Sequence, residues 1–139
     1  MTKFNQCKLE IKFEFGSCNS KYFTVVIDDN KSIKTITPTD NFYCTDIELP
    51  TQVKLAFSGK TDGDTLMDEN NNIVEDMYVK IAAIWLDKFP LSVKYIHQQI
   101  QIVTTSGETH TTSYIGFNGT VVLDYSEDNV FSQVLSLNN

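Results

Sequence analysis

The stretch KLEIKFEF, residues 8–15, decides the fold class of this 139-residue chain. Lysines and glutamates alternate there with apolar residues, which are Leu9, Ile11, Phe13 and Phe15. Successive side chains of an extended strand point to opposite faces, so this spacing gives one apolar face and one charged face. The stretch therefore predicts a half-buried strand, with one side of its sheet against a core and the other in water.

Other short runs rich in β-branched and aromatic residues follow along the chain. They are residues 22–27, 32–37, 42–49, 52–58, 77–86, 98–104, 109–115 and 119–125. Pro38 and Pro50 fall between runs, where a missing backbone donor costs no hydrogen bond. About ten short strands with turn signals at roughly ten-residue spacing predict an all-β sandwich or barrel. No linker divides the chain, so we expect one domain over residues 1–139.

Two runs leave a choice between strand and helix. Residues 77–86, MYVKIAAIWL, are apolar on both faces and fit either a central strand or a buried helix. We favour the strand, because valine, isoleucine, tyrosine and tryptophan are frequent there and no N-cap box precedes the run. Residues 130–137, VFSQVLSL, fit a last strand or an amphipathic helical turn.

The charge of the chain excludes several classes of partner. The formal net charge is −7, and all 11 basic residues are scattered lysines. Nucleic-acid binders and proteins bound to anionic membranes normally cluster lysine and arginine, so we expect neither partner. Cys7, Cys18 and Cys44 are odd in number and lack a CxxC spacing, which indicates neither a disulfide framework nor a zinc site. Because the first residues do not resemble a secretory signal, we expect synthesis in the cytoplasm.

The segment at residues 59–87 concentrates acidic side chains before the apolar run. Carboxylate and amide oxygens suit calcium, and they equally suit a solvated turn. A helix-loop-helix calcium site is excluded, because Ile73 stands where that motif needs glycine and Val79 where it needs glutamate. Two hypotheses stay open: a solvated hairpin tip at DENNN, residues 68–72, and an irregular calcium site made by Asp62, Asp64, Asp68 and Asp76.

Catalytic motifs are missing from the sequence. His97 and His110 have no evident partner for a dyad or zinc site, and neither a G-x-S-x-G elbow nor a phosphate-binding loop is present. We therefore predict that the chain is not an enzyme, with glycoside hydrolysis by two carboxylates as a minor alternative. Trp85 and Tyr114 are the candidate glycan-binding residues, because an aromatic ring offers an apolar face to a sugar.

Three stretches together resemble a β-sandwich domain of virion proteins from tailed bacteriophages, particularly phages of marine bacteria. That domain is itself similar to a carbohydrate-binding module. The stretches are residues 59–87, SYIGFNGTVVLDY at 113–125 and NVFSQ at 129–133. The resembling pattern has a lysine or glycine loop, an Asp-Thr pair, an acidic tip, an inward strand and an aromatic-glycine turn. Its counterparts here are Lys60, Asp64–Thr65, residues 68–70, residues 78–84 and residues 116–119.

This resemblance implies a jelly-roll-like antiparallel β-sandwich that works as a non-enzymatic capsid-decoration, tail or fibre component. It implies the virion as location, other virion proteins as partners and, in some cases, host polysaccharide as a further partner. No cofactor is expected unless calcium binds. The alternative function is a calcium-dependent carbohydrate-binding module, in which the four aspartates hold the ion and Trp85 or Tyr114 stacks on the sugar. A homo-oligomer stays open as well.

Overall fold

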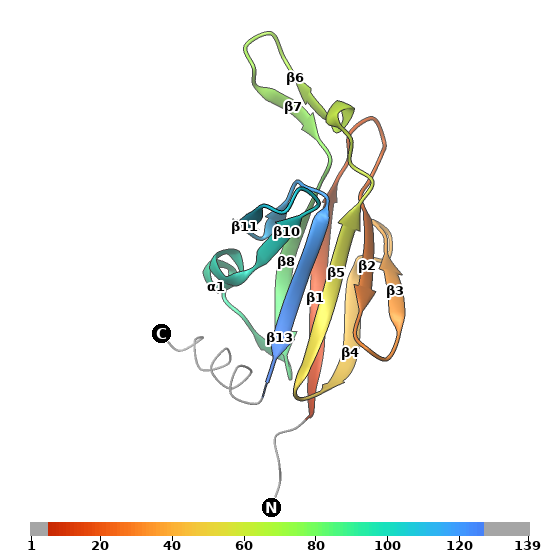
Figure 1. Cartoon of the computed structure of the whole chain (residues 1–139), viewed down its shortest axis with the longest axis vertical. Coiled ribbons are helices and arrows are strands. Elements are labelled where there is room, and N and C mark those ends of the chain that lie inside the picture. Colours follow the sequence, from red (N-terminus) through yellow and green to blue (C-terminus); the bar gives the residue numbers. More distant parts are fainter. Residues whose placement is uncertain (1–5, 127–139) are drawn as a thin grey trace, which may run out of the picture.

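The computed structural model describes residues 6–126, apart from the side chains of Val93, Tyr95 and Gln99. Two antiparallel sheets pack face to face around the core (Figure 1). The first sheet contains β1 (Gln6–Gly16), β4 (Phe42–Glu48), β8 (Tyr78–Leu86), β9 (Phe89–Pro90) and β12 (Tyr114–Ile115). The second contains β2 (Thr24–Asp28), β3 (Ile33–Ile36), β5 (Thr51–Ser58), β10 (Gln101–Thr104), β11 (Thr109–Thr111) and β13 (Gly119–Tyr125).

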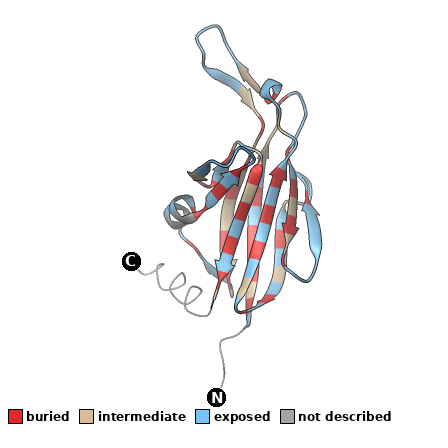
Figure 2. Ribbon diagram, in the orientation of Figure 1, coloured by how far each residue is buried: buried red, intermediate tan, exposed pale blue. Residues whose placement is uncertain are grey.

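The order of strands is β12-β8-β1-β4 in the first sheet, with β9 beside β8, and β11-β10-β13-β5-β2-β3 in the second. Buried and exposed residues alternate along the strands of both sheets (Figure 2). The core consists mainly of the inward residues of both sheets, as a sandwich requires. The predicted class, an antiparallel β-sandwich, is confirmed.

Strand β1 has the predicted pattern, with Leu9, Ile11 and Phe13 fully buried and Phe15 packed against the core. It pairs antiparallel with both β4 and β8, so it lies in the middle of its sheet. Because neighbouring strands pair with both edges of β1, only its charged face can meet water. Lys12 and Glu14 are exposed on that face, whereas Glu10 is buried and forms an ion pair with Lys88.

Strand β8 confirms the strand hypothesis for the run at residues 77–86 and excludes the buried helix. Its register against β1 shifts at Ala82, an extra residue that makes a β-bulge. The bulge explains why the apolar residues of this run do not alternate simply. It lets Ile81 and Ile84, three positions apart, both point into the core.

One helix was not predicted. Residues 93–99 form α1 (Val93–Gln99), and β10 begins only at Gln101, although the sequence predicts one strand over 98–104. The helix has two turns at most, too short for a periodic signal, and it is held by the burial of Ile96. The run at 109–115 also divides into β11 and β12, which belong to different sheets. The prediction for residues 130–137 lies outside the described residues.

A buried carboxylate closes the turn between β2 and β3. Asp29 accepts hydrogen bonds from the backbone N–H groups of Lys31 and Ser32, each at 2.9 Å. Its other oxygen accepts from Tyr43 OH at 2.7 Å and Thr45 Oγ1 at 2.9 Å. These bonds tie the turn of one sheet to β4 of the other. In the part of the chain that the structure describes, no helix combines the length and apolar character needed to cross a membrane.

A separate hairpin of β6 (Thr65–Met67) and β7 (Ile73–Asp76) connects β5 of the second sheet with β8 of the first. The short 3-10 helix η1 (Asp62–Asp64) precedes it. The hairpin projects beyond the end of the sandwich (Figure 1). The acidic segment of the sequence therefore forms an arm whose base lies beside the loops at that end.

Candidate functional site

Asp76, the last residue of β7, holds the base of the hairpin to the sandwich. Its carboxylate accepts hydrogen bonds from Lys60 Nζ at 2.7 Å, Thr65 Oγ1 at 2.7 Å and Tyr114 OH at 2.8 Å. Burial acts to raise the pKa of Asp76, but the hydrogen bonds from Lys60, Thr65 and Tyr114 outweigh it and lower that pKa. Asp76 is therefore a charged structural anchor at neutral pH.

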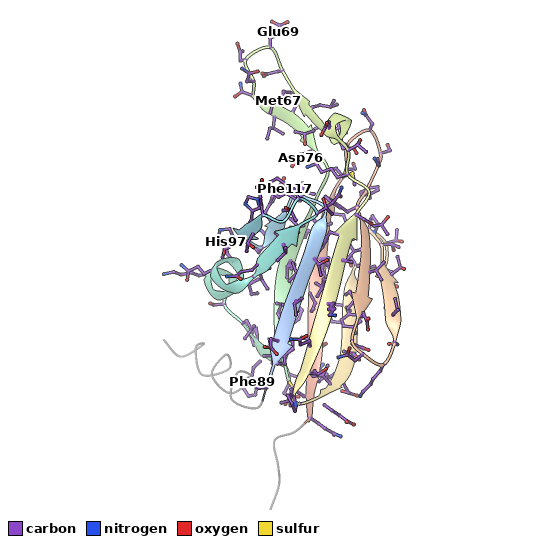
Figure 3. All side chains as sticks on the ribbon, in the orientation of Figure 1. Met67, Glu69, Asp76, Phe89, His97 and Phe117 are labelled. Carbon is purple, nitrogen blue, oxygen red and sulfur yellow. The ribbon has the colours of Figure 1, made fainter. Side chains whose placement is uncertain are left out.

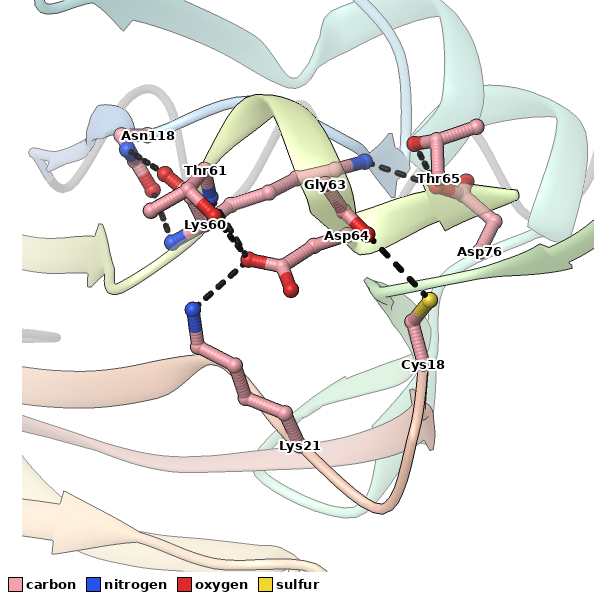
Figure 4. Close-up of polar contacts among 9 residues, drawn as sticks. All are labelled: Cys18, Lys21, Lys60, Thr61, Gly63, Asp64, Thr65, Asp76 and Asn118. Atoms are coloured by element: carbon pink, nitrogen blue, oxygen red, sulfur yellow. Dashed lines mark hydrogen bonds and ion pairs between the residues drawn. The ribbon is translucent and has the colours of Figure 1, made fainter.

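Asp64 anchors the loop before the hairpin in the same way (Figure 4). Its Oδ2 accepts hydrogen bonds from Lys21 Nζ at 2.7 Å, Thr61 N–H at 2.7 Å and Thr61 Oγ1 at 2.9 Å. The hydrogen bond from Lys21, followed by those from Thr61, lowers the pKa of Asp64 to about 2. The side chain is buried, so it supports the loop and is not available to a ligand in water.

Asp68 closes the tip of the hairpin. Its Oδ1 accepts the backbone N–H groups of Asn70 at 2.8 Å and Asn72 at 2.9 Å. These bonds, Asn72 first, lower the pKa of Asp68. Asn71 between them has a φ of 62°, a left-handed conformation that asparagine tolerates. The segment DENNN is thus the solvated hairpin tip that the sequence predicts.

The four aspartates predicted to bind calcium do not converge on one point. In the described part of the chain, no three His, Cys, Asp or Glu side chains are grouped to hold a metal ion. Asp64 and Asp76 each bind a lysine ammonium, and Asp68 binds its own turn. Calcium would have to displace both lysines, so these residues as arranged do not fit the ion.

A hollow of about 320 Å³ opens between the base of the hairpin and the loop before β13. It is lined by Lys60, Thr61, Asp62, Thr65, Gly116, Phe117 and Asn118. The Asn118 side chain joins its two walls, because Oδ1 accepts from Lys60 N–H at 2.9 Å and Nδ2 donates to the Lys60 carbonyl at 2.8 Å. Two loops far apart in sequence are thereby fixed against each other.

The hollow combines an aromatic ring with a carboxylate. The Phe117 side chain is 48% exposed, and its ring stacks on His110 with centroids 4.7 Å apart and an interplanar angle of 8°. Asp62 is exposed and, among residues 6–126, forms no hydrogen bond or ion pair. Of the four predicted metal ligands, Asp62 is thus the one whose carboxylate has no hydrogen-bond partner within the described residues.

The two predicted glycan-binding residues lie apart. Tyr114 borders the hollow, because a Cβ placed on Gly116 would lie 3.7 Å from the Tyr114 ring. Tyr114 also stacks on Tyr78, with centroids 4.5 Å apart, and both burial and its hydrogen bond to Asp76 raise its pKa. Trp85 lies five positions along β8 from Lys80, the partner of Tyr114, which is roughly 16 Å at the usual rise per residue.

Trp85 belongs to a different patch, where its ring tilts against Phe42 with centroids 6.0 Å apart. That patch also contains Glu10 and Lys88. The two predicted glycan-binding residues therefore cannot hold one sugar ring between them. Sequence reasoning missed Phe117 as a site residue, although the GFNG turn at residues 116–119 marks an aromatic side chain in an exposed loop.

One serine–histidine contact also went unpredicted. His97 Nδ1 lies 3.2 Å from Ser113 Oγ, and Ser113 N–H donates to the same nitrogen at 3.4 Å. Ser113 is buried, so a substrate cannot reach its hydroxyl. The contact holds α1 against the segment before β12. It was invisible in the sequence because α1 itself was not predicted.

Comparison with known proteins places the fold. No family model and no curated protein matches the chain. A solved structure described as vCBM60 in complex with galactobiose matches with a TM-score of 0.51 and 11% identity, covering 84% of this chain and 97% of that one. A selenomethionine form of vCBM60 matches with a TM-score of 0.51 and 12% identity, covering 85% and 90%. Its description concerns two families of calcium-dependent carbohydrate-binding modules. At this identity the likeness shows a shared fold alone.

Proposed function

We propose that this chain is a non-catalytic carbohydrate-binding domain and that sugar binds in the hollow at the base of the β6–β7 hairpin. The proposal depends on the composition of that hollow, whose lining includes both the exposed Phe117 ring and the free Asp62 carboxylate. An aromatic ring can cover the apolar face of a sugar, while polar groups bond its hydroxyls. The fold shared with carbohydrate-binding modules supports the same conclusion.

The size and rigidity of the hollow favour a small part of a glycan. Its volume of about 320 Å³ is at the lower end of ligand pockets, which suits one or two sugar units. The contacts of Asn118 with Lys60, and of Lys60 with Asp76, fix the lining before a ligand arrives. A preformed site loses less conformational entropy on binding, so even a shallow hollow can bind usefully.

The carboxylates around the hollow do not favour hydrolysis. A glycosidase needs two carboxyl groups across the scissile bond, one of which has a raised pKa to act as acid. Asp64 and Asp76 have lowered pKa values and hold lysines, which leaves Asp62 alone beside the sugar. This arrangement supports binding without catalysis.

Calcium has no role in this proposal, although the description of one vCBM60 structure mentions calcium dependence. Asp64 and Asp76 are bound by lysines and Asp68 by its own turn, which leaves Asp62 as a single open carboxylate, too few ligands for the ion. We therefore expect sugar binding to be the same in calcium and in EDTA.

A tailed-phage virion is the proposed setting for this domain, and it rests on the sequence resemblance at residues 59–87 and 113–125. Many copies on one particle would multiply weak contacts with host polysaccharide. Copurification with intact particles tests that setting. A chain absent from purified virions would remove the setting and leave sugar binding untouched.

The test of sugar binding is a panel of neutral oligosaccharides, galactobiose among them, measured by isothermal titration calorimetry. The variants are Phe117→Ala and Asp62→Asn. Loss of one stacked ring should weaken binding by about five- to tenfold, since such contacts contribute about 1 kcal/mol. The matched control is Phe42→Ala, an exposed phenylalanine in the Trp85 patch. The proposal falls if no saccharide binds, or if Phe42→Ala removes binding and Phe117→Ala does not.

A further inference from the structure

Side chains project from both strands of the β6–β7 hairpin (Figure 3), and three of its apolar residues are exposed, Met67, Ile73 and Val74. Met67 is 58% exposed and Ile73 is 60% exposed, and the two lie directly opposite each other in the hairpin. A ligand that covers such a pair would remove its apolar surface from water, which would stabilise the complex. The hollow described above does not include either residue.

The register of the hairpin connects this pair to the hollow. Thr65 pairs with Asp76 and Met67 pairs with Ile73, and the register shifts between these pairs because Val74 is an extra residue on β7, while β6 itself has no insertion. Thr65 and Met67 are two positions apart on β6, so their side chains lie on the same face of the strand. Thr65 lines the hollow. Met67 therefore continues that wall along the arm, roughly 7 Å beyond Thr65 at the usual rise of a strand.

The base of the arm is rigid. Asp76 binds Lys60 and Tyr114 from two other parts of the sandwich, so the hairpin is fixed in orientation at the point where it meets the hollow. The methionine side chain itself is flexible and polarizable, and it adapts to irregular surfaces. A fixed arm with adaptable apolar contacts suits a long ligand that already occupies the hollow.

The charges around the arm disfavour an anionic ligand. Asp62 in the hollow and Asp68 and Glu69 at the tip are exposed carboxylates. Lys60, the cation in the lining of the hollow, is already neutralised by Asp76. A chain of uronic acids or sulfated sugars would meet the exposed carboxylate of Asp62 in the hollow and that of Glu69 at the tip, with no free lysine in the lining to offset them. An uncharged chain meets no such repulsion, and its sugar rings offer apolar faces to Met67 and Ile73.

We propose that Met67 and Ile73 form an extended subsite for further units of an uncharged polysaccharide whose end or segment occupies the hollow. This inference rests on the proposed function of the hollow. It assigns the hairpin a binding role that the hollow alone does not require. Affinity should then rise with the length of the oligosaccharide until the chain reaches the apolar pair.

The experiment compares the wild type with Met67→Ser/Ile73→Ser in calorimetry against a neutral length series of two to six units. The series is built on the disaccharide that binds tightest in the panel above. We expect wild-type affinity to rise on the order of fivefold or more with length, as added apolar contact implies. The double variant should lose this gain and keep its affinity for the disaccharide. Ile33→Ser, an isoleucine 71% exposed on β3, is the matched control and should behave as wild type.

The outcomes separate the two proposals. Disaccharide binding that depends on Phe117 but shows no gain with length overturns the extended subsite and leaves the hollow's function standing. A wild type that binds no member of the panel overturns both. If oligogalacturonates bind as tightly as neutral chains of the same length, the inference that the polysaccharide is uncharged is overturned. If the wild type self-associates in sedimentation and Met67→Ser/Ile73→Ser abolishes this association, the arm is an interface between copies and the subsite is overturned.

Discussion

Lys60 and Asp76 should be strongly coupled in their effects on stability, because their ion pair is shielded from water. Nζ and Oδ1 are 2.7 Å apart, and the two side chains are 15% and 13% exposed. Breaking a buried pair leaves an uncompensated charge and costs about 3–5 kcal/mol when burial is complete. Because this pair lies at the rim of the hollow, we expect about 2 kcal/mol for Lys60→Met. Asp76→Asn should cost about 3 kcal/mol, since Thr65 and Tyr114 also lose a charged acceptor.

The double variant Lys60→Met/Asp76→Asn should be less destabilised than the sum of the two, by about 1–2 kcal/mol, because no unpaired charge remains in it. Urea unfolding followed through the fluorescence of Trp85 measures all four free energies. The matched control is the Lys34–Asp40 pair, 3.6 Å apart with side chains 44% and 62% exposed. Its coupling should stay below about 0.5 kcal/mol. If the coupling free energy of Lys60 and Asp76 is no larger than that of Lys34 and Asp40, the conclusion that the Lys60–Asp76 pair is shielded from water is refuted.

Three further predictions follow from the described contacts. Asp29 has a pKa of about 2, because its hydrogen bonds from Tyr43 and neighbouring groups outweigh the effect of burial. The contribution of Asp29 to the free energy of unfolding is therefore complete above the unfolded pKa near 3.8 and is lost as pH falls toward 2. In Asp29→Asn the free energy of unfolding should consequently fall less steeply with pH between about 3.8 and 2. Tyr114→Phe should lower stability by about 1 kcal/mol in urea unfolding by removing one hydrogen bond to Asp76, and Tyr22→Phe, an exposed tyrosine on the same end, should not. Millimolar calcium should leave the melting temperature unchanged, because we expect no calcium to bind and only a ligand selective for the native state would raise that temperature. A rise in melting temperature that Asp62→Asn abolishes would instead show a calcium site at Asp62.

Local sequence patterns predicted most of the strands. The alternation in KLEIKFEF gave the correct core face of β1, and GTVVLDY at 119–125 coincides with β13. The sequence also predicted the turn at DENNN, residues 68–72, because aspartate and asparagine side chains form hydrogen bonds with the backbone of nearby residues. Helix α1 was missed because it is too short for a periodic signal and depends on burial of Ile96. The bulge in β8 was hidden because it is defined by the partner strand.

The candidate site could be predicted only in its residue types. The acidic segment and the aromatic residues were visible, but their partners were not: Lys21 is 43 positions from Asp64, and Asn118 is 58 positions from Lys60. The partner that folding brings to a carboxylate decides whether it is a metal ligand, a structural anchor or an open group. Asp62, Asp64 and Asp76 therefore cannot be told apart from their neighbours in the sequence.

The amino-acid order by itself thus determined which segments extend and which face of each is apolar, since both depend on near neighbours. Only the packing of two sheets decided that lysines bind two of the four aspartates and that Phe117 and Asp62 line one hollow. Those relations arise when strands distant in sequence become adjacent, and no local pattern encodes that adjacency.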